Sequence, residues 1–273
     1  MIDANIRRQW LSPLLDAALA AGDAIMEIYS AGIDVREKQD SSPVTDADEA
    51  AEAIILDTLR KLEPALPIVA EESMAAGNGP NSVGQAFWLV DPLDGTREFI
   101  NKSTDFTVNI GLIVDGAPAL GVVFAPARNL LFWGDAENGA FVADVIGGQR
   151  GEARPVTVRP EPADGLIAVA SKSHRTPETD DFLSALPLKD SQSAGSSLKF
   201  CLVAEGKADI YPRFGPTMEW DTAAADAVLR AAGGAVLNPD GSLFVYGKPD
   251  FRNGYFIARG HEDLDRFINR QAP

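Results

Sequence analysis

The two aspartates of the segment DPLDGT, Asp91 and Asp94, are the residues of this sequence best suited to chemistry. They follow the apolar run 87–90, and an apolar run bounded by proline and glycine is typical of a buried strand. Pro92 and the later Gly95 predict that the backbone turns as this strand leaves the core. We therefore expect both carboxylates at the carboxyl edge of a strand, where open α/β sheets bind their ligands.

Two carboxylates this close in sequence repel each other unless a cation compensates them. A hard divalent cation is the simplest partner, because Mg²⁺ prefers carboxylate, carbonyl and water oxygens and commonly takes a substrate phosphate as a further ligand. Asp91 and Asp94 therefore predict a metal-dependent site for phosphoryl chemistry.

Further acidic residues stand where a helix begins or a strand ends, so they could join the same site. They are Asp46 and Asp48 at the start of one expected helix, Glu71 and Glu72 after the short apolar strand 67–70, and Asp221 at the start of another helix. Each also has an ordinary explanation, since an acid at a helix start is usually a cap and paired glutamates after a strand usually form a solvated turn. Thr45 and Asp48 have a spacing similar to that of a capping box, which gives Asp48 a structural interpretation beside a catalytic one.

The composition narrows the class of protein. With 273 residues and 45% hydrophobic content, the chain can bury a large core. Its net charge of −16 argues against a protein that binds nucleic acid through a basic surface, although a single nucleotide could still bind. Cys201 is the only cysteine, which excludes an internal disulfide and fits a reducing cytoplasm.

No apolar stretch approaches the ~18 residues of a membrane span, and residues 1–10 lack the apolar core of a signal peptide. We therefore expect a cytoplasmic protein without a transmembrane segment, with peripheral association at the inner membrane left open.

Hydrophobic periodicity predicts both helices and strands. Ser12 and Pro13 are typical of a helix start, and the apolar spacing predicts a helix from there to near Gly32. A second helix follows Asp48, and residues 106–142 have the apolar runs and turns of an antiparallel meander.

The Gly-rich segment 147–151 predicts an internal boundary, after which strands and helices alternate. We expect an amino-terminal α+β half, residues 1–150, that carries most metal ligands. The carboxyl-terminal α/β half, residues 151–273, would carry the substrate-binding segment. The two halves would form one compact α/β unit with the active site between them.

Several motifs occur in an order and spacing that resemble the inositol monophosphatase superfamily of lithium-sensitive, magnesium-dependent phosphatases. They are PVTDAD at 43–48, AEE at 70–72, WLVDPLDGT at 88–96, GAF at 139–141 and WDTAA at 220–224. The resemblance covers nearly the whole chain and implies a layered αβαβα sandwich of the inositol monophosphatase and sugar phosphatase type.

The resemblance also implies roles for individual residues. Two or three Mg²⁺ ions would be held by Glu71, Asp91, the Leu93 carbonyl, Asp94 and Asp221. Asp48 and Thr96 would orient the attacking water, while the cations would neutralise phosphate charge and stabilise the leaving oxygen. Asp46 departs from the family pattern, in which a small residue often stands at that position, and we expect it to be solvated.

Segments 195–206 and 211–217 resemble the CysQ-type 3′(2′),5′-bisphosphate nucleotidases of sulfur metabolism, which convert 3′-phosphoadenosine 5′-phosphate to AMP. The residues that this resemblance implies around the nucleotide are Gly95, Thr96, His174, Ser196, Lys199, Arg213 and Asp221. A guanidinium and an ammonium suit a 5′-phosphate that is bound but not cleaved. Without the resemblance, Lys199 would be interpreted as a surface charge and Arg213 as a salt bridge at the edge of the core.

Two other functions stay open on the sequence. One is an inositol-1-monophosphatase or related sugar phosphatase, in which Lys199 and Arg213 would be incidental. The other is a catalytically silent metal-binding protein on the same fold. The expected partner is a small-molecule bisphosphate nucleotide and not nucleic acid, and the sequence does not decide between a monomer and a homodimer.

Overall fold

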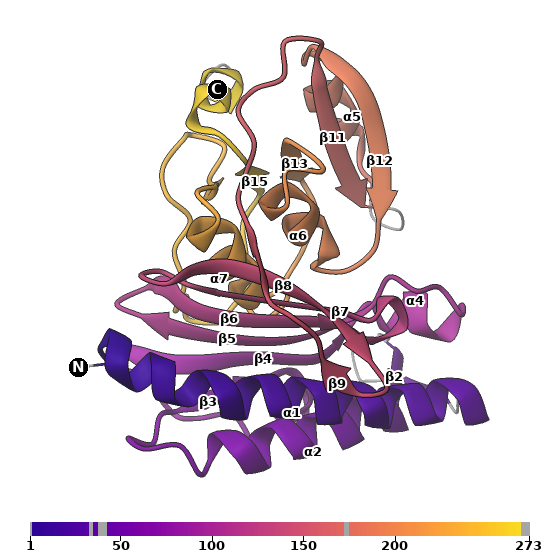
Figure 1. Ribbon diagram of the computed structural model, residues 1–273, viewed down its shortest axis with the longest axis vertical. Coiled ribbons are helices and arrows are strands. Elements are labelled where there is room, and N and C mark those ends of the chain that lie inside the picture. Colours follow the sequence, from indigo (N-terminus) through magenta and orange to yellow (C-terminus); the bar gives the residue numbers. More distant parts are fainter. Residues whose placement is uncertain (1, 33–34, 38–42, 172–174, 269–273) are drawn as a thin grey trace.

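Five layers, in the order helices, sheet, helices, sheet, helices, make up the structure (Figure 1). The computed structural model describes residues 2–32, 35–37, 43–171 and 175–268. This arrangement confirms the predicted αβαβα sandwich. In the part of the chain that is described, no helix is both long enough and apolar enough to cross a membrane.

The outer helical layer beneath the first sheet consists of α1 (Ala4–Ala31) and α2 (Asp46–Leu59). The prediction that Ser12 and Pro13 start the first helix is wrong, because α1 begins at Ala4 and Pro13 lies inside it. Trp10 and Leu14, on either side of Pro13, are both buried, so packing against the sheet offsets the hydrogen bond that proline cannot donate.

The start of α2 confirms the predicted capping box. The Thr45 hydroxyl accepts from the amide of Ala47 at 3.2 Å, and the Asp48 carboxylate accepts from the amide of Thr45 at 2.8 Å. The preceding strand β2 (Pro43–Thr45) pairs with β1 (Val35–Glu37) in a small separate ribbon.

The first sheet confirms the predicted antiparallel meander and extends it at both edges. In spatial order its strands are β10 (Arg154–Val156), β8 (Gly139–Ile146), β7 (Leu130–Asp135), β6 (Ala117–Ala125), β5 (Thr107–Val114), β4 (Ala86–Asp94) and β3 (Ile68–Ala70), with β9 (Gln149–Arg150) paired to β8. Among the strands described in this sheet, only β3 and β4 are parallel neighbours. Because β10 returns to pair with β8, the sheet continues past the Gly-rich segment 147–151, and the division at residue 150 stays a prediction.

The second sheet has the order β12 (Leu188–Ala194), β11 (Leu166–Ser171), β13 (Ile210–Arg213), β15 (Phe256–Arg259) and β14 (Ala235–Leu237). Sequence periodicity did not find β12, because this edge strand is polar and largely exposed. Helices α6 (Leu198–Ala204) and α7 (Ala223–Ala231) fill the space between the sheets, while α5 (Pro177–Ser184) packs on the far face and α8 (Asp265–Ile268) lies near the carboxyl terminus (Figure 1). Short helices α3 (Glu71–Ala75), α4 (Thr96–Ile100), η1 (Pro126–Arg128) and η2 (Glu262–Leu264) complete the described elements.

Three glycines form a row across the first sheet directly beneath α7. Gly111, Gly121 and Gly134 are register partners on β5, β6 and β7. A Cβ atom on Gly121 would lie 2.0 Å from the carbonyl oxygen of Ala224, and one on Gly134 would lie 2.6 Å from a backbone atom of α7. The missing side chains therefore let the alanine-rich face of α7 touch the sheet. This contact fixes the start of α7 on β5, because the Cβ position of Gly111 lies against Ala223 and Ala224.

Gly121→Ala tests this close approach. The added methyl group meets helix backbone, so we expect a loss of about 1–3 kcal/mol in the free energy of unfolding, measured by urea denaturation. Gly254→Ala is the matched control, because nothing lies within 4 Å of its Cβ position, and it should change stability by less than about 0.5 kcal/mol. Equal stability of the two variants would contradict the proposed contact.

Candidate metal and phosphate site

Two acidic residues reach the site from neighbouring parallel strands. Ala70 at the end of β3 is the register partner of Val90 on β4, so the next residues, Glu71 and Asp91, lie side by side. Glu71 begins α3, and this short helix is fixed by the buried carboxylate of Glu52. Glu52 accepts from the amides of Glu72 and Ser73 at 2.8 and 2.9 Å.

A β-bulge brings Asp94 to the same side of β4 as Asp91. The predicted turn at Pro92 is wrong in one respect, because the strand continues to Asp94 instead of ending at Asp91. Asp91 pairs with Asn109 and Asp94 with Thr107, so β4 carries one more residue than β5 over this stretch. In a regular strand, residues three apart point to opposite faces, and the extra residue reverses that. Proline is tolerated in such a bulge, since the ladder hydrogen bond is already interrupted there.

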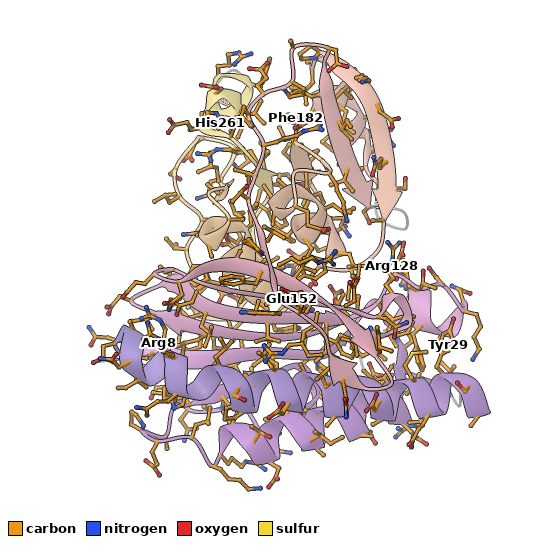
Figure 2. The ribbon with its side chains drawn as sticks, in the orientation of Figure 1. Arg8, Tyr29, Arg128, Glu152, Phe182 and His261 are labelled. Atoms are coloured by element: carbon orange, nitrogen blue, oxygen red, sulfur yellow. The ribbon has the colours of Figure 1, made fainter. Side chains whose placement is uncertain are left out.

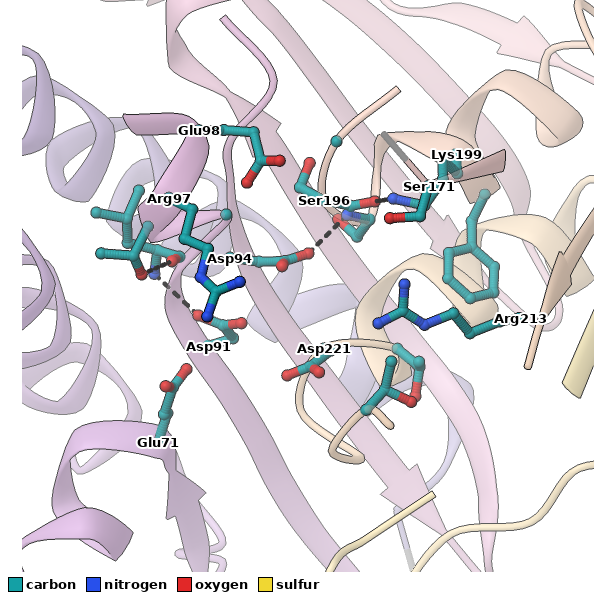
Figure 3. Close-up of a pocket in the computed structure, with 18 of the residues that line it drawn as sticks. Glu71, Asp91, Asp94, Arg97, Glu98, Ser171, Ser196, Lys199, Arg213 and Asp221 are labelled. Carbon is teal, nitrogen blue, oxygen red and sulfur yellow. Dashed lines mark hydrogen bonds between the residues drawn. The ribbon is translucent and has the colours of Figure 1, made fainter. Parts of the chain in front are cut away.

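Asp221 completes the acidic cluster from the opposite part of the chain. It stands two residues before α7, whose contact with the glycine row brings it over β4. One oxygen each of Glu71, Asp91 and Asp221 can be chosen so that all three lie within 4.8 Å of one another, and Figure 3 shows these carboxylates facing a common space. Hard oxygen donors in this arrangement fit a divalent cation such as Mg²⁺.

Lys199 and Arg213 do not fully offset the burial of the acidic cluster and the repulsion within it, because the pKa values of Asp94 and Asp221 are still raised. Burial, together with the carboxylates of Glu71 and Glu98, raises the pKa of Asp94 to about 6, against the opposing effects of Lys199 and the amide of Ser197. Burial and the carboxylates of Asp94 and Glu71 raise the pKa of Asp221 well above its usual value. Such shifts are compatible with a cation site, because a bound metal ion would remove the penalty of ionising these acids.

Asp48 and Thr96, the predicted catalytic pair, are in contact. The hydroxyl of Thr96 lies 3.2 Å from Asp48 Oδ1 and 3.3 Å from the carbonyl oxygen of Leu93. The other carboxylate oxygen, Asp48 Oδ2, serves the capping box of α2. One oxygen of Asp48 therefore confirms the capping interpretation, while the other contacts Thr96, and the catalytic role stays a prediction. Asp46 is exposed and pairs with Arg36 at 2.7 Å, as expected for a solvated residue.

Two cations lie at the other end of the same cavity. Lys199 on α6 is buried, and its ammonium donates to the carbonyl oxygens of Ser196 at 2.5 Å and Ala194 at 3.3 Å. Burial lowers its pKa to about 8, and the nearby charge of Arg213 acts in the same direction. Arg213, also buried, donates to the carbonyl oxygen of Pro216 at 2.9 Å, while its Nε has no hydrogen-bond partner among the described residues.

A cavity of about 290 Å³ joins the acidic and the cationic ends (Figure 3). Its walls include every predicted site residue in the described ranges except Asp48, which contacts the cavity wall through Thr96. His174 lies outside the described residues. Sequence reasoning missed Arg97, Glu98, Ser171, Phe200, Tyr211 and Thr217, which also line the cavity. Arg97 and Glu98 closely follow or adjoin DPLDGT, and Phe200, Tyr211 and Thr217 lie within the segments 195–206 and 211–217, so all five could have been found by adjacency. Ser171 comes from a strand that only the fold brings near.

The raised pKa values predict that metal binding competes with protons. Because Asp94 keeps a proton up to about pH 6, Mg²⁺ should bind more tightly at pH 7.5 than at pH 5.5, and binding at pH 6 should release protons. Because the pKa values of Asp94 and Asp221 are higher in the folded than in the unfolded protein, the free energy of unfolding of the metal-free protein should fall as pH rises from about 4, their usual pKa, through 6. Calorimetry in two buffers of different ionisation enthalpy measures the proton release, and an affinity independent of pH would contradict the prediction.

Asp91→Asn tests the metal assignment directly. Removing one charge from the cluster should weaken Mg²⁺ binding by at least about tenfold, measured by calorimetry or by the metal-induced rise in melting temperature. Asp16→Asn, on the exposed face of α1, changes the net charge equally and should leave metal binding unaltered. If both variants bind Mg²⁺ like the unmodified protein, the cluster is not the metal site.

Comparison with known proteins places this site in a family. The model of the inositol monophosphatase family matches residues 7–272. The 3′(2′),5′-bisphosphate nucleotidase CysQ of Escherichia coli is 45% identical over 238 residues, which span 86% of this chain and 93% of that protein. The structure of CysQ from Bacteroides thetaiotaomicron, at 38% identity, superposes with a TM-score of 0.76 over 91% of this chain and 96% of that one. An inositol monophosphatase from Anabaena superposes with a TM-score of 0.74 at 29% identity, over 97% of each chain. The family predicted from the sequence motifs is therefore confirmed, and the chain belongs to the inositol monophosphatase family.

Proposed function

We propose that this protein is a metal-dependent 3′(2′),5′-bisphosphate nucleotidase that removes the 3′-phosphate of 3′-phosphoadenosine 5′-phosphate to give AMP and phosphate. The similarity to proteins named CysQ, at 45% identity in the Escherichia coli case, supports the reaction. The observation that carries the choice of substrate is the pair of buried cations, Lys199 and Arg213, on the side of the cavity away from Glu71 and Asp91 (Figure 3).

Two phosphates suit the two ends of this cavity. Arg213 lies close enough to Lys199 to disfavour the charge of the lysine, so an anion between the two side chains would relieve that repulsion. The Nε of Arg213, which has no partner among the residues that the structure describes, could donate to such an anion. We assign the 5′-phosphate to this cationic end, where it is held and not cleaved. A monophosphate would leave these cations without a phosphate partner.

The acidic end suits the phosphate that is cleaved. We propose that Glu71, Asp91, Asp94, Asp221 and the carbonyl oxygen of Leu93 hold two or three Mg²⁺ ions. Bound there, the ions would neutralise phosphate charge, lower the pKa of water and stabilise the leaving oxygen. The four side chains come from β3–α3, β4 and the start of α7, so the site is complete only when these elements are packed together.

The Asp48–Thr96 pair would handle the attacking water. When the Thr96 hydroxyl donates to Asp48, its oxygen lone pairs are free to accept a hydrogen bond from water, which orients the nucleophile. The capping box fixes Asp48 from its other oxygen, so the carboxylate cannot rotate away. Gly95 and Ser196, which line the cavity between the two ends, would contact the bound nucleotide.

Lys199→Ala and Arg213→Ala test the proposed function. Loss of one charge-assisted contact to the 5′-phosphate should cost about 1.5–3 kcal/mol, or roughly a ten- to hundredfold drop in kcat/KM for 3′-phosphoadenosine 5′-phosphate. Adenosine 3′-monophosphate is the matched control substrate, because it carries the same scissile group and base but no 5′-phosphate. Its kcat/KM should scarcely change in either variant.

Inositol 1-phosphate distinguishes the remaining alternatives in the same assay. If the unmodified protein prefers inositol 1-phosphate, or if both variants lose equally on all three substrates, the nucleotidase proposal fails. A zero rate with Mg²⁺ on every substrate would instead favour a catalytically silent metal-binding protein.

A further inference from the structure

The turn at residues 195–197, which precedes Lys199 on α6, is held by two carboxylates from the amino-terminal part of the chain. Asp94 accepts from the amide of Ser197 at 2.6 Å, and Asp105 accepts from the amide of Gly195 at 3.1 Å. Ser196, which lies between Gly195 and Ser197, has φ 48°, in the left-handed region. Both acids precede β5, whereas the turn joins β12 to α6, so these two bonds connect the first sheet to the carboxyl-terminal layers.

Asp105 is itself fixed by Arg128 from η1. Both Nε and a terminal nitrogen of Arg128 donate to Oδ1 of Asp105, and Oδ2 of the same carboxylate accepts from Gly195. The Asp105 side chain is 9% exposed and that of Arg128 is 37% exposed. Figure 2 shows Arg128 at the level where the first sheet faces the carboxyl-terminal layers. Neither residue belongs to the described cavity lining.

The turn fits tightly against this ion pair. A Cβ atom on Gly195 would lie 2.6 Å from the carbonyl oxygen of Asp105 and 2.8 Å from its Cβ, so the backbone of the turn lies directly against Asp105. The carbonyl oxygens of Ala194 and Ser196, on either side of this glycine, are the two acceptors of the Lys199 ammonium. A displacement of the turn therefore moves the ammonium.

We propose that the Asp105–Arg128 ion pair is a positioning device that sets Lys199 for the uncleaved phosphate of the substrate, so that Arg128 determines specificity without touching the ligand. This inference rests on the proposed function of Lys199. Arg128, whose side chain lies outside the cavity lining, should therefore affect the hydrolysis of bisphosphates but not that of monophosphates.

Arg128→Ala should lower kcat/KM for 3′-phosphoadenosine 5′-phosphate by about tenfold or more and leave that for adenosine 3′-monophosphate nearly unchanged, because a small misplacement of a binding group is costly. Arg128→Lys should recover part of the loss, since an ammonium can still pair with Asp105. Affinity for AMP, measured by calorimetry in chelator, should fall in parallel, which provides a readout independent of metal and turnover.

Arg159→Ala is the matched control. Arg159 pairs with buried Asp209, whose carboxylate also accepts from a backbone amide, that of Ile167 at 2.6 Å, and the exposure of this arginine, 33%, is close to that of Arg128. Removing it should lower the melting temperature to a similar extent without changing the ratio of the two kcat/KM values. If Arg159→Ala lowers the ratio of kcat/KM for the bisphosphate to that for the monophosphate as much as Arg128→Ala does, the inference is wrong.

A double variant separates this inference from the proposed function. If Arg128 acts through Lys199, then Arg128→Ala should add no further loss on the bisphosphate in a Lys199→Ala background. If Lys199→Ala is selective for the bisphosphate but the two losses multiply, the positioning role is wrong while the nucleotidase assignment stands. If Lys199→Ala is not selective, the lysine subsite itself is wrong and the inference falls with it.

Discussion

Mutual repulsion among clustered carboxylates is the constraint on which this structure depends. Glu71, Asp91 and Asp221 have oxygens within 4.8 Å of one another, and Asp94 is close enough to raise the pKa of Asp221. Left to themselves, such groups would separate or take up protons. The surrounding fold must therefore hold them together at a cost, which a bound metal ion would repay through direct coordination.

The framework resists this repulsion through rigid backbone contacts. The buried carboxylate of Glu52 fixes the start of α3, the bulge at Pro92 sets the direction of Asp94, and the glycine row lets α7 touch the sheet. Each device acts on the backbone next to an acid and not on its carboxylate. Bringing the acids together lowers the stability of the fold but creates the candidate metal site. Packing contacts elsewhere in the fold offset that loss of stability.

The cavity separates charge along its length, with Glu71 and Asp91 from the edge of the first sheet on one side and Lys199 and Arg213 from the carboxyl-terminal layers on the other (Figure 3). Its geometry therefore depends on how the two sheets sit on each other. The bonds from Asp94 and Asp105 to the turn at 195–197 cross this junction, so Asp94, which belongs to the acidic cluster, also helps to locate the cationic end. A substrate with two phosphates would engage both ends at once, which favours the bisphosphate.

Local sequence determined the features that depend on neighbouring residues. The spacing of Thr45 and Asp48 predicted the capping box, the apolar run before Asp91 predicted β4, and the motif order predicted the family, because short-range hydrogen bonding and strand formation are set within a few residues. The start of α1 was mispredicted because burial of Trp10 and Leu14 outweighs the local preference of Pro13. Only the tertiary structure decided that Lys199 is buried and not a surface charge, that one extra residue in β4 points Asp94 toward Asp91, and that Arg128 fixes a turn far along the chain. These features depend on contacts between segments far apart in sequence, whose distances are fixed by packing and not by spacing along the chain.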